Sequence, residues 1–247
     1  MRSRGVFSDI REFFVSRPAI QTLIEYSTEA EREDYSQRIL QRVGVSVTGY
    51  TILNIHRIGI RAPVKFVHEE LMHWDGTSSY WPNHIATVES IDGSREHIQI
   101  VILGRLTHFL RNWRRKSAAE LGTLFKMTAL KFQHVPEPSD VDNARFFLYE
   151  CSGGYPIGVF CMYVRSPVKE QGEEDLTQLF FAVSFNFYGR KGWPRVPLIG
   201  RTWERIHNRV TANVLNKFKR ICETDFQDIT DGSGITAPKF NKARSVN

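Results

Sequence analysis

Apolar and polar positions repeat with a changing period along the chain, and each change marks a predicted element. From about residue 47, the run VTGYTILNIHRIGIRA has a period of two, which predicts a long strand. Pro63 then suits the first position of a helix. Apolar residues at spacings of three and four follow it on one helical side: Val64, Val67, Leu71 and Trp74. The pattern therefore predicts a strand followed directly by a short amphipathic helix.

Further strand-like runs follow between residues 85 and 188. In order they are IATVESI, EHIQIVILG, LFKMTALKFQHV, ARFFLYEC, YPIGVFCMYVRS and LTQLFFAVSFNFY. Asp92 and Gly93 between the first two are the signal of a tight hairpin, and the later connections are rich in turn residues. Together with the strand near residue 52, these runs predict an antiparallel meander of about seven strands.

Helical periodicity dominates both ends of the chain. Residues 7–43 predict two helices separated near Pro18, and the second opens with Thr28 and Glu31 at the spacing of a capping box. Residues 201–223 predict a long helix that can lie across a whole sheet. Its apolar positions recur every three or four residues, at Trp203, Ile206, Val210, Val214, Phe218 and Ile221.

Composition and charge favour an ordinary globular protein. The 247 residues are 41% hydrophobic and 24% charged, and the formal net charge of +6 is spread among acidic residues along the chain. Three scattered cysteines are too few for a disulfide framework or a paired-cysteine metal site. No stretch has the pattern of a secretory signal or a membrane span, so the sequence predicts a cytoplasmic protein.

Three sequence features together resemble those of one superfamily. They are IGIRAPVKFVHEELMHW at residues 58–74, the Trp81-Pro82 pair, and the helix WERIHNRVTANVLNKFKRI. In this order the chain resembles the START-like superfamily, also called SRPBCC, over residues 46–226. That superfamily includes lipid-transfer domains, plant hormone receptors and polyketide cyclases.

The resemblance implies an α+β helix-grip fold with extra N-terminal helices. In that fold a curved antiparallel sheet of about seven strands wraps around the long C-terminal helix and leaves an elongated cavity between the two. We therefore expect residues 1–45 to form a helical extension, residues 46–226 a START-like ligand-binding domain, and residues 227–247 a polar tail.

The strand near residue 52 offers the first candidate binding residues. Asn54 and His56 share a face with Ile52 and Ile58, so they are polar groups at the centre of an apolar face. If that face lines the cavity, they can hydrogen-bond a ligand head group or assist an acid-base step at a carbonyl. The alternatives are that this is the outer face, or that both residues bond to neighbouring groups.

Aromatic residues after the short helix are the second group of candidates. Trp74, Tyr80 and Trp81 combine apolar area with one polar group each, which suits the mouth of a pocket and suits a core equally well. Nearby, His68 and His73 are five residues apart, which places them about 140° apart on a helix and argues against a metal site. No metal or other cofactor is predicted.

Residues 105–116 form a basic amphipathic segment. Its apolar residues fall on one helical side and its cations, Arg111, Arg114, Arg115 and Lys116, crowd the other. Such a segment is typical of peripheral contact with an anionic membrane, and also of a helix that packs its apolar side against the domain. No nucleic-acid partner is expected, because no known binding module surrounds the segment.

These features favour a protein that binds or transfers a hydrophobic small molecule or lipid. The chain has no GxSxG elbow, no phosphate-binding loop and no Cys with an evident His partner. An enzyme of the polyketide cyclase or aromatase type is the alternative, since such enzymes shape a substrate inside the same cavity without portable motifs. A domain whose cavity is filled by its own Phe side chains is a third possibility. Whether the protein is an enzyme stays open at this point.

Overall fold

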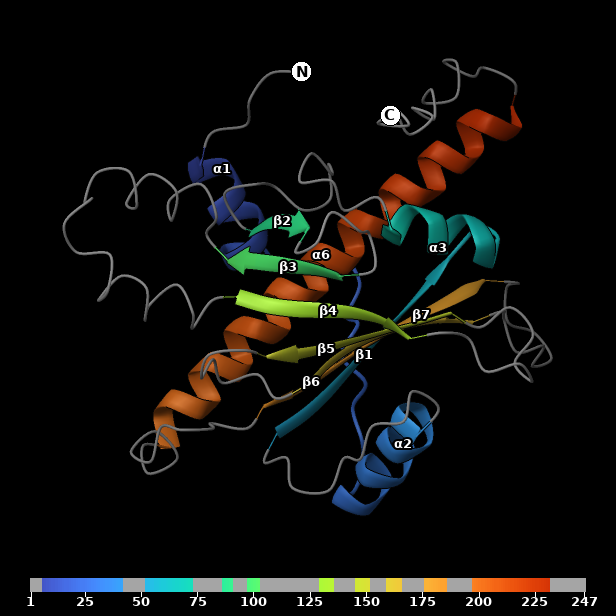
Figure 1. Ribbon diagram of the computed structural model, residues 1–247. Helices are drawn as coiled ribbons and strands as arrows, with labels where there is room; N and C mark the ends of the chain where they lie inside the picture. The colour runs from blue at the N-terminus through green and yellow to red at the C-terminus, as the bar shows by residue number, and fades with distance from the viewer. Residues whose placement is uncertain are drawn as a thin grey trace, which may run out of the picture.

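A computed structural model describes residues 6–41, 52–72, 86–90, 97–102, 129–135, 145–151, 159–165, 176–185 and 197–231 (Figure 1). The helices are α1 (Val6–Ile10), the π-helical turn η1 (Arg11–Val15), α2 (Glu29–Gln41), α3 (Val64–Met72) and α6 (Pro197–Thr230). The strands are β1 (Ile52–Ile60), β2 (Ala86–Ser90), β3 (His97–Ile102), β4 (Ala129–Val135), β5 (Arg145–Cys151), β6 (Val159–Arg165) and β7 (Thr177–Phe185).

The strands form one antiparallel sheet in the order β1-β7-β6-β5-β4-β3-β2. From β2 to β7 each strand pairs with the next, as in the predicted meander. The first strand pairs instead with the last, with Ile52 opposite Phe185 and Ile60 opposite Thr177. The predicted α+β class, with an antiparallel sheet and a long C-terminal helix, is confirmed. The hairpin turn at Asp92 and Gly93 lies outside the described residues.

Both faces of β1 are covered, which explains why it is buried at nearly every position. Asn54 and His56 face α6, whereas Arg57 belongs to the opposite face, near Tyr35 of α2. Figure 1 shows α2 on the other side of β1 from α6. The alternation predicted from the sequence therefore separates a side that meets α6 from a side that meets α2.

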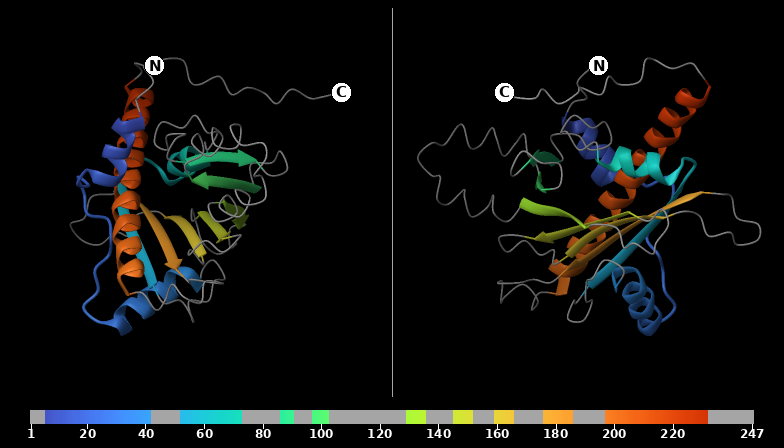
Figure 2. Two further views of the ribbon diagram at one scale, coloured as in Figure 1. Left: turned by 90° about the vertical axis from the view of Figure 1, so that its left-hand side faces the viewer. Right: turned by 45° about the vertical axis from the view of Figure 1, so that its right-hand side comes forward.

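The C-terminal helix is longer than predicted. It has 34 residues, which corresponds to about 51 Å, and it lies along one face of the sheet in the direction of β1 (Figure 2). It begins at Pro197, a residue that the first helical position tolerates because its missing N–H has no partner there in any helix. Residues 227–230 are exposed, so the last turn has no apolar stripe by which the pattern would reveal it.

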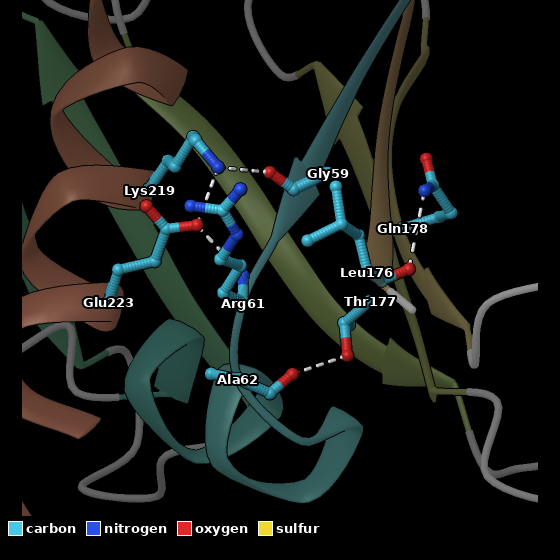
Figure 3. A network of polar contacts seen from close by, with 8 residues as sticks. All are labelled: Gly59, Arg61, Ala62, Leu176, Thr177, Gln178, Lys219 and Glu223. Atoms are coloured by element: carbon cyan, nitrogen blue, oxygen red, sulfur yellow. Dashed lines mark hydrogen bonds and ion pairs between the residues drawn. The ribbon is translucent and has the colours of Figure 1, made fainter. Parts of the chain in front are cut away.

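A cluster of polar contacts joins α6 to the end of β1 (Figure 3). The Lys219 ammonium donates to the carbonyl of Gly59 at 2.6 Å and pairs with the Glu223 carboxylate at 2.5 Å. The same carboxylate accepts the backbone N–H of Arg61 at 2.8 Å. These contacts satisfy backbone groups where the strand ends, and they fix the direction in which the chain enters α3.

The N-terminal segment packs on α6 as well. Phe13 is fully buried against Val214 and Val210 of that helix. The side-chain amide of Asn213 donates to the carbonyl of Phe13 at 2.9 Å, so a hydrogen bond accompanies the apolar contact. The two helices predicted between residues 7 and 43 are confirmed, as α1 with η1 and as α2, and the first of them is anchored to the far end of the sequence.

Residues 22–24 extend the sheet beyond β1. The backbone N–H of Arg57 donates to the carbonyl of Thr22 at 2.7 Å, and that of Ile24 donates to the carbonyl of Ile55 at 2.9 Å. An isolated bridge pairs Leu23 with His56. The edge of β1 is thereby covered, since an unpaired edge would present open backbone groups.

The start of α2 carries the predicted cap. Thr28 Oγ1 accepts the backbone N–H of Glu31 at 3.1 Å, and the Glu31 carboxylate accepts the N–H of Ser27 at 3.0 Å. The capping interaction is therefore confirmed, although the carboxylate reaches one residue further back than in the standard box.

Replacing Thr28 with Ala should destabilise α2 by about 1 kcal/mol, because one N–H of its first turn loses its acceptor. Amide hydrogen exchange in α2 is the measurement, and we expect roughly fivefold faster exchange there for this loss. Ser27→Ala is the matched control, since it removes a neighbouring hydroxyl and keeps the backbone N–H that Glu31 accepts. Equal exchange rates in the two variants would contradict the capping role of Thr28.

Candidate functional site

A groove of about 770 Å³ lies between α6 and the N-terminal segment. Residues between 17 and 23 form one wall, and residues between 201 and 212 form the other. Both walls meet at the edge of β1, to which residues 22–24 are hydrogen-bonded. Its charged lining residues are Arg17, Arg201, Glu204, Arg205 and Arg209.

The groove borders the two polar residues predicted on β1. The amide of Asn54 donates to Glu204 Oε1 at 3.1 Å, and His56 Nε2 lies 3.2 Å from Asn208 Oδ1. Glu204 and Asn208 also line the groove. Glu204, bonded to Asn54, and Asn208, bonded to His56, therefore separate these two residues from the open space.

His56 is bonded through both ring nitrogens. Because an amide oxygen can only accept, Nε2 carries the proton toward Asn208, and Nδ1 accepts the hydroxyl of Thr22 at 2.9 Å. The ring is fully buried and meets the edge of Phe181 at 6.4 Å between centroids. Burial lowers the pKa of His56 to about 4, against a smaller opposing effect of the Asn208 hydrogen bond. The imidazole is therefore neutral near pH 7.

The sequence-predicted residues thus fall into two groups. Asn54 and His56 lie together on the face toward α6, and both bond to neighbouring groups, which was one of the alternatives left open by the sequence. Trp74, Tyr80 and Trp81 lie outside the described residues, as does the basic segment 105–116.

Sequence reasoning missed the arginines of the groove. Arg201, Arg205 and Arg209 recur every four residues, so a signal was present in the sequence. The apolar stripe of the same helix has a similar spacing and masks this basic pattern. Arg17 had no signal at all, since its place opposite α6 follows only from the tertiary fold.

A second feature is the composition of the sheet face that carries Asn54. Cross-strand partners share a face, so the register defines rows that run from β1 to β2. The row of Asn54 continues with hydrophobic or aromatic residues on the next strands and ends on a serine: Val183, Phe160, Tyr149, Phe132, Ile98 and Ser90. The row of His56 continues through Phe181, Met162 and Phe147 to His134.

The opposite face has a different character. The row that starts at Leu53 becomes polar on the outer strands, where it contains Glu150, Lys131, Gln99 and Glu89. This polar character is confined to the outer strands, since the row of Ile55 on the same face continues through Ala182, Cys161 and Leu148. Outer strands with hydrophobic residues on one face and charged residues on the other are typical of a sheet with one covered and one solvated side. The apolar face is the one on the side of α6.

Neither a metal cluster nor a membrane-spanning helix is found in the described part of the chain. Across those ranges, no three His, Cys, Asp or Glu side chains are grouped as a metal site would need. Of the helices in the same ranges, none combines the length and the apolar character required to cross a bilayer.

No family model matches the sequence, and no curated protein is similar to it. Solved structures with a similar arrangement include the Zhui aromatase/cyclase of Streptomyces sp. R1128, at 14% identity and a TM-score of 0.47, covering 74% of this chain and 99% of that one. A protein of Thermus thermophilus has 8% identity and a TM-score of 0.43, over 70% and 98%.

A polyketide-cyclase-like protein of Corynebacterium glutamicum has 13% identity and a TM-score of 0.36, with coverage of 75% and 97%. At such identities and TM-scores the likenesses say nothing of a ligand. What bears on function is therefore the geometry of this chain.

Proposed function

We propose that the protein binds a hydrophobic small molecule or lipid against the apolar face of the sheet, in a helix-grip arrangement closed by α6. The observation that supports this is the hydrophobic row from Val183 to Ile98, which crosses β7, β6, β5, β4 and β3 on the side of α6. The backbone of α6 comes closest to β1, η1 and α3. The apolar residues on the outer strands of this face are therefore the ones that we propose a ligand contacts.

Hydrophobic burial supplies the affinity in this proposal. At about 25 cal/mol per Å² of apolar area removed from water, a lipid-sized molecule gains several kcal/mol without a specific polar contact. Polar residues then decide which ligand is accepted. Asn54 and His56 stay proposed for this role, together with Trp74, Tyr80 and Trp81. A head group that reached Asn54 or His56 would have to replace their bonds to Glu204 and Asn208.

The proposed ligand-binding domain spans residues 46–226, with residues 1–45 as its N-terminal extension. A cyclase would use the same face, but it receives no separate support from His56, because both ring nitrogens of that residue are already bonded. Binding and transfer are therefore the function that the geometry favours.

A polar substitution on the apolar row should weaken binding of a neutral hydrophobic probe. We expect Phe132→Gln to reduce Nile red affinity about tenfold, because a buried amide without partners opposes an apolar ligand. Lys131→Gln introduces the same residue one position earlier on β4, in the opposite row, and should leave the affinity unchanged. Fluorescence titration measures both, with circular dichroism as the check on folding.

If Phe132→Gln fails to fold, Phe132→Trp takes its place in the titration. We expect this variant also to lower Nile red affinity, because the larger ring narrows the space without adding an unpaired amide. Native mass spectrometry of the protein purified without detergent should in addition show a bound apolar molecule. Equal affinities in the variants of the two rows, together with mass spectra of the empty chain alone, would contradict the proposal.

A further inference from the structure

The groove between α6 and residues 17–23 is lined by arginines and is separate from the apolar sheet face. We propose that it binds a small ligand carrying two or more phosphate groups. The site is independent of the hydrophobic function proposed above, because Asn54 and His56 lie behind its wall and the apolar rows lie beyond them.

The spacing of the arginines fits several anionic groups in succession. Arg201, Arg205 and Arg209 follow one another every four residues, so their Cα atoms rise by about 6 Å per step and span about 12 Å. Arg17 lines the same groove from the N-terminal wall. A guanidinium presents two parallel N–H groups to a phosphate, which gives both strength and a preferred orientation. A single phosphate would engage only part of this set.

The described residues do not balance the positive charge of the groove. Within the described part of the chain, none of the four arginines has an ion-pair partner, and the single carboxylate of the lining, Glu204, already accepts the amide of Asn54. No acidic residue occupies the first turn of α6, whose N-terminal end is the positive end of the helix dipole. The positive potential of the groove therefore comes from the guanidinium groups of its walls, and an anion would be stabilised there.

The groove is held open by bonds that do not involve the arginines. Asn216 donates to the carbonyl of Ile20 at 2.9 Å and accepts its N–H at 3.0 Å, which ties the N-terminal wall to α6. Leu23 is bridged to β1, and Asn208 is bonded to His56. Because both walls are already fixed, a ligand has little backbone to order on binding.

The size and chemistry of the groove favour a small phosphorylated molecule. About 770 Å³ falls within the roughly 300–1,000 Å³ of small-ligand pockets. Among the described residues no aromatic side chain lines it, whereas single-stranded nucleic acids are bound by stacking their bases on aromatic rings. A free nucleoside diphosphate and a lipid head group with two phosphates share the required chemistry.

Calorimetric titration of the full chain with inorganic pyrophosphate tests the site. We expect saturable binding that is weakened about tenfold or more in the double variant Arg205→Gln with Arg209→Gln, because two guanidinium contacts are lost. Arg220→Gln removes an exposed arginine of the same helix away from the groove and should leave the affinity unchanged. Absence of saturable binding, or equal affinity in the double variant and the wild type, would overturn the proposal.

Two further arms distinguish the source of the phosphates. ADP binding that the double variant loses assigns a free nucleotide. Binding to phosphatidylcholine vesicles containing phosphatidylinositol bisphosphate, again lost in the double variant, assigns a lipid head group. Binding of either kind that the double variant retains would place the phosphates elsewhere and refute the site. Nile red affinity should be the same in the double variant and the wild type, so failure here is distinguishable from failure of the hydrophobic-ligand proposal.

Discussion

Replacing Phe13 with Ala should lower the free energy of unfolding by about 3–5 kcal/mol, the cost of removing a fully buried phenyl ring. Phe13 holds the N-terminal segment on α6 through Val214 and Val210, and the Lys217 ammonium lies 4.9 Å from its ring centre. The substitution leaves a cavity and removes this cation-π contact. Urea unfolding of the full chain, followed by circular dichroism, measures the loss.

Phe7→Ala is the matched control for this prediction. Phe7 lies one turn and a half earlier in the same helical segment and is 88% exposed. Its removal should change stability by no more than about 0.5 kcal/mol. A loss of similar size in both variants would show that Phe13 has no special part in anchoring the N-terminal segment.

Acidification should destabilise the protein through His56. Burial lowers the pKa of this residue from 6.5 to about 4, so below pH 6.5 the unfolded chain binds a proton that the folded chain does not. Stability is therefore fully present above pH 6.5 and is lost as the pH falls toward the folded pKa. Between about pH 7.5 and pH 5 the loss from His56 is about 2 kcal/mol. His207 contributes in the same direction, because burial and the charge of His56 lower its pKa too.

His56→Gln isolates this contribution. Glutamine does not titrate, yet its amide can donate toward Asn208 and accept from Thr22. The difference between urea unfolding free energies at the two pH values should shrink by about 2 kcal/mol in the variant. An unchanged difference would mean that folding does not lower the pKa of His56.

Local patterns predicted the elements well and their partners poorly. The period of two located β1, and the Thr28 to Glu31 spacing located the cap of α2, because both signals lie within a few consecutive residues. The sequence could not show that residues 22–24 pair with β1, since three residues are too few for a periodic signal. The last turn of α6 was missed for a related reason, because its one hydrophobic residue, Ile229, is exposed and does not continue the apolar stripe.

For the candidate sites too, the sequence predicted local features and missed the contacts between distant residues. The face shared by Asn54 and His56 was readable from alternation, but their partners Glu204 and Asn208 lie about 150 residues away. Whether a polar group on an apolar face meets a ligand or another side chain depends on such distant contacts. The groove is a still clearer case, because one of its walls comes from the start of the chain and the other from α6.

The amide of Asn213 and the carbonyl that it binds at Phe13 are 200 residues apart. β1 likewise pairs with β7, which follows it in the chain only after β2 to β6. During synthesis η1 and β1 therefore lack these native partners until α6 and β7 have been made. Native contacts of such long range close slowly, so the apolar side chains of these elements stay exposed to water during that interval.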